Sequence, residues 1–199
     1  MRTRPLPLLA LTVCAAASLA GCVRFGPKTP TSLLTLASTA QVAPGPARTV
    51  SDGQAVLVAL PSVPAELAAL RVPVRTTPNE IAYLKDATWA DAPARLFRNV
   101  LADAIGARTG RLVLDPRGAA VSPGIRLSGR LQSFGLDVAK RSAVVTFDGS
   151  LARANTATVA ARRFHAEVPV TAEDGPNVAA ALSQASNQIA AEVADWIGA

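Results

Sequence analysis

Residues 125–170 read IRLSGRLQSFGLDVAKRSAVVTFDGSLARANTATVAARRFHAEVPV, three segments in which apolar and polar residues alternate. A period of two is typical of strands that bury one face of a sheet. Polar turns at 140–142 and 154–156 separate the segments, so the stretch predicts an antiparallel meander. The phase of the alternation flips within the first segment, which predicts a β-bulge near Ser133.

Two segments that flank the meander carry apolar residues at helical spacing. The first is expected to start at Asp91 as N-cap, with Pro93 in its first turn, and Gly106 and Gly110 mark its end. The second is expected to start near Pro176 and to run to the C-terminus. Because each helix has one apolar face, each should pack on the sheet. The predicted fold class is α+β, a mostly antiparallel sheet with two amphipathic helices packed on one face.

Shorter elements precede the first helix. The run Ala55–Leu60 is apolar throughout and predicts a strand buried on both faces. Ser32–Ala37 and Glu80–Leu84 are further strand candidates, and Pro64–Leu70 could form one or two helical turns. The prolines in and after Arg71–Thr77 favour an extended conformation there.

The N-terminus has the features of an export signal. Arg2 and Arg4 precede the apolar stretch Leu6–Ala20, which is shorter than the roughly 20 residues of a membrane span. The following residues, Leu19 to Cys22, resemble the lipobox of bacterial lipoproteins, in which the chain is cut before a cysteine that carries fatty acyl groups such as palmitate. We therefore expect Cys22 to be the lipidation site; the alternative is an ordinary secretory peptide with a cysteine at the cut site by chance.

This interpretation divides the chain into a signal peptide (1–21), a lipidated N-terminus with a short linker (22–31) and a single α+β domain (32–199). Two or three acyl chains anchor a protein stably to a membrane. Val23 follows the cysteine, where an aspartate often marks retention in the inner membrane of enterobacteria. The expected location is therefore the cell envelope, at the periplasmic face of the outer membrane.

Composition excludes several classes of function. Removal of the signal peptide leaves 178 residues (199 minus 21), enough for one domain with one core. It also leaves 18 basic and 14 acidic residues, which are scattered, so we expect no nucleic-acid partner. With Cys14 removed and Cys22 acylated, no cysteine remains for a disulfide.

Catalytic and metal-binding motifs are missing from the sequence. The chain has one histidine, His165, beside Arg163 and Glu167, and a lone histidine on a strand is more typical of a surface than of a catalytic site. Nucleotide-binding glycine motifs and nucleophile motifs are absent. Asp86 and Asp91 flank a tryptophan, but helix capping accounts for Asp91. We therefore expect no catalytic residue, no metal and no cofactor.

The segment 71–93, RVPVRTTPNEIAYLKDATWADAP, concentrates residue types that are common at interfaces. It contains Arg71, Arg75, the only tyrosine of the chain, Tyr83, and one of two tryptophans, Trp89. One interpretation is packing, because Tyr and Trp often cover the edge of a core. The other is a partner-binding rim, because Tyr, Trp and Arg are enriched at binding hot spots.

The same segment resembles the central signature of the ABC-type transport auxiliary lipoproteins: an arginine-flanked extended stretch, a tyrosine-containing strand, a tryptophan turn and a proline-led helix. The residues that carry the resemblance are Arg71, Arg75, Ile81 to Leu84, Trp89, Pro93, Leu96 and Phe97. The resemblance continues in outline to the C-terminal helix. This chain departs from relatives that have paired aromatics in having Tyr83 alone.

The resemblance implies a non-enzymatic, lipid-anchored accessory component of an ABC transporter with an MCE-domain protein, a permease and an ATPase. Such systems are implicated in moving phospholipids or other hydrophobic molecules across the envelope, and the lipoprotein would dock the periplasmic assembly at the outer membrane. A multimeric MCE partner would be matched by a homo-oligomer of this chain. The alternatives are a stand-alone outer-membrane assembly or structural lipoprotein and, third, a tethered periplasmic enzyme.

Overall fold

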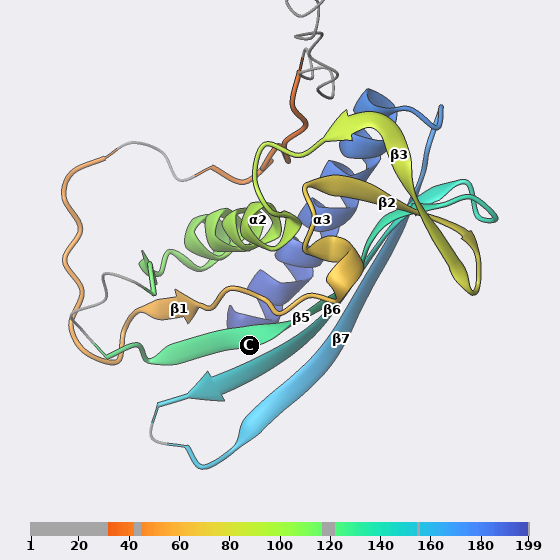
Figure 1. Cartoon of the computed structure of the whole chain (residues 1–199). Helices are drawn as coiled ribbons and strands as arrows, with labels where there is room; N and C mark the ends of the chain where they lie inside the picture. The colour runs from red at the N-terminus through yellow and green to blue at the C-terminus, as the bar shows by residue number, and fades with distance from the viewer. Residues whose placement is uncertain (1–31, 42–44, 117–121, 155, 199) are drawn as a thin grey trace, which may run out of the picture.

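The computed structural model describes residues 32–41, 45–116, 122–154 and 156–198. In this part of the chain, a seven-stranded mixed sheet packs against two long helices (Figure 1). In chain order the elements are β1 (Val56–Val58), the 3-10 turn η1 (Ala65–Leu67), β2 (Arg71–Thr77), β3 (Glu80–Thr88), α2 (Pro93–Thr109), β4 (Val113–Leu114), β5 (Ile125–Asp137), β6 (Ser142–Arg153), β7 (Val159–Pro169) and α3 (Gly175–Gly198).

The predicted meander is confirmed as β5, β6 and β7, which pair antiparallel in sequence order. The predicted bulge is confirmed as well. Leu131 pairs with Phe147 and Ser133 pairs with Thr146, so Gln132 is the extra residue on β5. The extra residue shifts the alternation by one position, so the apolar side chains before and after the bulge are buried on the same face of the sheet.

The other edge of β5 is shared by two short strands that both run parallel to it. β1 pairs with its first three residues, Ile125–Leu127, and β2 pairs with Leu136 and Asp137 near its end. β3 extends the sheet antiparallel beyond β2, and β4 lies parallel to β1. The sheet is therefore mostly, but not purely, antiparallel.

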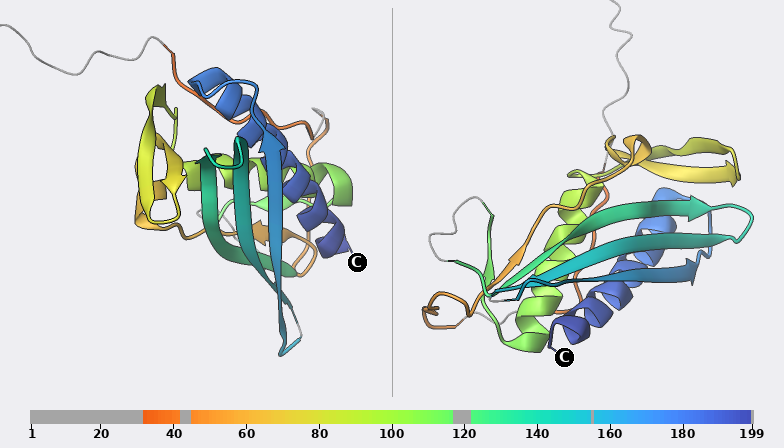
Figure 2. Two further views of the ribbon diagram at one scale, coloured as in Figure 1. Left: turned by 90° about the vertical axis from the view of Figure 1, so that its right-hand side faces the viewer. Right: turned by 90° about the horizontal axis from the view of Figure 1, so that it is seen from below.

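Both helices cover the same face of the sheet, as predicted (Figure 2). Phe97 of α2 lies 5.4 Å from the ring of Phe147, and Trp196 of α3 lies 5.6 Å from Phe164. Phe147 and Phe164 are register partners on β6 and β7, so their side chains leave the sheet on one side. This face and the two helices enclose the hydrophobic core, and the α+β class is confirmed.

The ends of the helices differ in detail from the prediction. The N-cap position of α2 is Ala92, not Asp91, although the Asp91 carboxylate accepts a hydrogen bond from the Ala92 N–H at 2.7 Å. Gly106 is buried within α2, and the helix ends at Thr109, followed by the C-cap residue Gly110 with a left-handed φ of 66°. That conformation is one that glycine adopts without steric cost.

The expected strand Ser32–Ala37 is not a strand but a strap. Leu34 forms an isolated parallel bridge with Trp89, and the chain then crosses α3. The Thr39 N–H donates to Asn187 Oδ1 at 2.8 Å, and Asn187 Nδ2 donates to the Ala37 carbonyl at 2.7 Å. We call residues 32–40 the N-terminal strap.

Candidate functional site

The β2–β3 hairpin brings three of the four predicted rim residues together. Val72 and Val74 of β2 face the core, so alternation places Arg71 and Arg75 on the opposite side. Tyr83 lies on that side too, because its register partner is Pro73. We call this side, formed by Arg71, Arg75, Ile81 and Tyr83, the hairpin face.

The two arginines of the hairpin face, Arg71 and Arg75, form no ion pair within the described residues. The Arg71 guanidinium lies 4.4 Å from the centroid of the Tyr83 ring, a cation–π distance. The Arg75 side chain donates one long hydrogen bond, 3.4 Å, to the Pro78 carbonyl. Within the described residues, neither arginine lies within 4.0 Å of a carboxylate oxygen. Both cations are therefore free to meet an acceptor from outside.

Trp89 lies on the other side of the hairpin, in the core. Its side chain is 1% exposed, and its ring is 5.5 Å from that of Phe134. The indole N–H has no hydrogen-bond partner in the part of the chain that the structure describes. Packing, the first of the two interpretations of this segment, therefore fits Trp89, while the arginines and Tyr83 remain at the surface.

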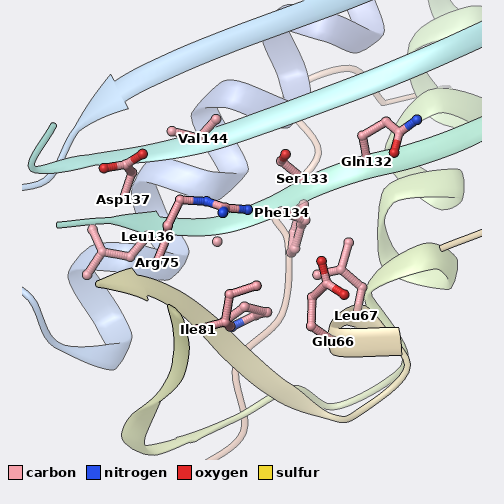
Figure 3. A pocket seen from close by; sticks show the side chains of 12 residues that line it. Glu66, Leu67, Arg75, Ile81, Gln132, Ser133, Phe134, Leu136, Asp137 and Val144 are labelled. Carbon is pink, nitrogen blue, oxygen red and sulfur yellow. The ribbon is translucent and has the colours of Figure 1, made fainter. Parts of the chain in front are cut away.

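A pocket opens beside the hairpin face, where β1 and β2 separate along β5 (Figure 3). Ser62, after β1, forms an isolated bridge with Arg130 of β5, and β2 pairs with β5 only from Leu136 onward. Between Arg130 and Leu136, where β5 bulges, no strand pairs with this edge of β5 among the described residues. The hollow has a volume of about 410 Å³, including space open to solvent. The residues that line it are Glu66, Leu67, Pro73, Arg75, Ile81, Gln132, Ser133, Phe134, Gly135, Leu136, Asp137 and Val144.

Both apolar and charged side chains line the pocket. Val144 and Asp137 lie on one side of it, and Glu66 and Ile81 lie on the other, with Arg75 reaching between them (Figure 3). Apolar side chains with polar neighbours are a common composition of interface hot spots. Sequence reasoning missed Glu66 and Asp137, although the predicted bulge was a signal, because bulges are frequent next to functional sites.

The face of the meander that the helices leave uncovered carries a polar network. Arg163 binds the Asp148 carboxylate through two hydrogen bonds of 2.6 and 2.8 Å, and Gln132 donates a third at 2.9 Å. These donors, Arg163 first, lower the pKa of Asp148 to about 2. In contrast to Arg71 and Arg75 of the hairpin face, Arg163 and Asp148 on this surface pair with each other.

His165 belongs to a second polar cluster on the same face. Its Nε2 lies 2.9 Å from the Glu167 carboxylate, and its Nδ1 lies 2.9 Å from the Thr146 hydroxyl. Lys140 also binds Glu167, and these hydrogen bonds, that of Lys140 first, lower the pKa of the Glu167 carboxyl. His165 is exposed on β7, and the described residues contain no group of three or more side chains that could hold a metal ion.

The predicted lipidation site, Cys22, and the predicted signal peptide lie outside the described residues. Among the described helices, none is long and apolar enough to cross a membrane.

Comparisons with known proteins agree with this architecture. The crystal structure of a Xanthomonas campestris protein of family DUF330 is 25% identical, with a TM-score of 0.69 over 84% of this chain and 94% of that one. The crystal structure of a second, uncharacterized protein is 20% identical, with a TM-score of 0.63 over 74% of this chain and 94% of that one. No curated protein matches the chain.

The family comparison covers most of the described domain. The sequence model for the ABC-type transport auxiliary lipoprotein component matches residues 34–194, from the strap to the last turns of α3. The resemblance found in segment 71–93 is thus part of a match over most of the domain, and the chain belongs to the family of ABC-type transport auxiliary lipoproteins.

Proposed function

We propose that this protein is a non-enzymatic, lipid-anchored accessory component of an ABC/MCE-type transporter that moves phospholipids or other hydrophobic molecules across the cell envelope. In this role the acylated Cys22 holds the domain at the periplasmic face of the outer membrane. The domain then docks the periplasm-spanning MCE assembly there, while a permease and an ATPase supply the passage and the energy. Family membership and the lipobox support this proposal.

The observation that carries the proposal is the hairpin face. It presents two arginines that have no carboxylate partner among the described residues, an aromatic ring and the exposed Ile81, next to the pocket beside β5. Tyr and Arg are the residue types that dominate binding energy at interfaces. A surface of this kind fits the docking of another protein better than it fits catalysis.

The strap limits how far this face can lie from the membrane. Because residues 32–40 are fastened to Trp89 and α3, the tether from Cys22 comprises only residues 22–31. Ten residues span at most ~33–36 Å. Leu34 bridges Trp89 at the end of β3, so the described chain begins beside the β2–β3 hairpin (Figure 1). A short tether at that position favours a docking role close to the membrane.

Site-directed photo-cross-linking in intact cells tests the proposal. A benzophenone amino acid replaces Tyr83 on the hairpin face, and, in a matched control, Ala180 on the exposed side of α3. The proposal expects a cross-link to an MCE-domain protein from position 83 and much less from position 180. Cross-links only to outer-membrane or cell-wall proteins would favour the stand-alone structural lipoprotein instead.

A further inference from the structure

Three strands form free edges of the sheet in the described chain, and they are protected unequally. β4 has only two residues, and β7 carries Arg162, Arg163 and Glu167, all in ion pairs. Short edge strands and charged side chains are the common protections against pairing with another chain. β3, in contrast, reads Ile-Ala-Tyr-Leu over 81–84, with Ile81 38% exposed and Ala82 also exposed.

The backbone groups of this part of β3 point outward. The Arg75 carbonyl accepts a hydrogen bond from the Val138 N–H at 3.1 Å, so Arg75 turns its backbone groups toward β5. Its register partner on β3 is Ile81, which therefore forms a non-hydrogen-bonded pair. The N–H and C=O of Ile81, and by alternation those of Tyr83, face the free edge.

The chain already pairs with this edge of β3 at its other end. The Leu34 N–H donates to the Thr88 carbonyl at 2.8 Å, and the Leu34 carbonyl accepts from the Ala90 N–H at 2.8 Å. These are the two bonds that an added parallel strand would make. Asp86, with a φ of 54°, interrupts β3 between the bridged end and residues 81–84. The open portion therefore continues an edge that is competent for strand addition.

We propose that β3 receives an extended segment of the periplasmic partner, which adds to the sheet as a strand along residues 81–84. This inference rests on the proposed function, because it specifies how the accessory protein would hold its partner. Main-chain hydrogen bonds to Ile81 and Tyr83 supply the affinity. Alternate side chains of the added strand lie on the hairpin face, where the unpaired Arg71 and Arg75 favour acidic residues.

The test compares proline with alanine at position 81, in the full-length mature protein. Ile81→Pro removes an outward N–H and leaves the hydrogen bonds between β2 and β3 in place. Ile81→Ala removes the side chain and keeps the N–H. Val159→Pro is the matched control, at the exposed first residue of the other long edge strand. Binding to a purified MCE-domain protein from the same organism is measured for each variant.

Strand addition predicts that Ile81→Pro weakens binding at least tenfold, while Ile81→Ala weakens it less than threefold and Val159→Pro leaves it unchanged. A second measurement uses the unmodified protein, so that a folding defect of the proline variant cannot decide the result. The amide protons of Ile81 and Tyr83 should exchange at least tenfold more slowly in the complex than in the free lipoprotein.

Each other outcome overturns the inference. If the wild type binds the MCE protein and the amides of Ile81 and Tyr83 are not protected, docking uses another surface, and the proposed function stands. If those amides become protected in the lipoprotein alone as its concentration rises, a second copy occupies the edge. If the wild type does not bind the MCE protein, both the inference and the proposed function are refuted.

Discussion

Replacing Trp89 with alanine should destabilise the domain strongly, because the structure places this residue in the core. The side chain is 1% exposed and packs at 5.5 Å from Phe134. Removal of a buried aromatic side chain costs about 3–5 kcal/mol, through lost burial and the cavity left behind. For a domain of this size that loss corresponds to a decrease in Tm of roughly 10 °C.

The Trp89→Phe variant separates packing from polarity. Phenylalanine keeps most of the ring contact with Phe134 and removes an indole N–H that lacks a partner among the described residues, a group whose burial costs about 1–3 kcal/mol. We therefore expect Trp89→Phe to lose less than half as much stability as Trp89→Ala. Tyr83→Ala, at the partly exposed hairpin face, should cost about 1 kcal/mol or less.

Urea unfolding of the mature domain, followed by far-ultraviolet circular dichroism, measures these differences without using tryptophan fluorescence, which the substitution itself changes. If Trp89→Ala costs less than about 1 kcal/mol, or no more than Tyr83→Ala, the residue does not support the core. The assignment of Trp89 to packing, and of Tyr83 to the surface, would then be wrong.

Three further substitutions test other parts of the structure. Asp148→Asn should lower the free energy of unfolding by about 1 kcal/mol at pH 5, a modest value for a solvent-screened pair. Because the folded-state pKa of Asp148 is depressed to about 2, the stabilisation by this carboxylate is present above about pH 4 and is lost as the pH falls toward 2. Urea titrations should therefore show that the stability difference between wild type and variant disappears near pH 2. Asn187→Ala should release the strap, seen as at least tenfold faster amide exchange in residues 37–39 with global stability changed by about 1 kcal/mol or less. Gly135→Ala should cost about 1–3 kcal/mol, because a Cβ there would lie 2.4 Å from the Pro73 carbonyl oxygen, whereas Gly198→Ala, with open space around it, should not change the Tm.

The sequence was sufficient to predict the elements whose signal is local. Alternation over 125–170 predicted β5, β6 and β7, and its change of phase predicted the bulge to within one residue, at Gln132. Helical periodicity predicted α2 and α3 and the shared face they cover. In each case neighbouring residues carry the pattern, so no knowledge of distant contacts was needed.

The pairing of strands that are distant in the chain could not be predicted from local sequence patterns. β1 and β2 lie parallel to β5 at opposite ends of it, and nothing in their own short sequences specifies that partner. The strap shows the same difficulty, because its contacts to Trp89 and to Asn187 join residues far apart in the chain. An extended segment with apolar residues therefore predicts a strand, although only Leu34 forms a bridge.

The candidate site was predictable in composition but not in arrangement. Segment 71–93 was singled out because of its Arg, Tyr and Trp residues, yet the parity of the strands decides which of them face solvent. Arg71, Arg75 and Tyr83 share the outward side, while Trp89 follows the bulge at Asp86 and turns into the core. The pocket depends on the separation of β1 from β2 along β5, which is a tertiary feature.

The most direct test of the central claim is to isolate the tagged protein from gently solubilised, cross-linked envelopes and to identify its partners by mass spectrometry. An accessory component of an ABC/MCE-type transporter should recover an MCE-domain protein, with or without its permease and ATPase. Recovery of only outer-membrane or cell-wall proteins would contradict the transporter role and would make the structural lipoprotein the better account.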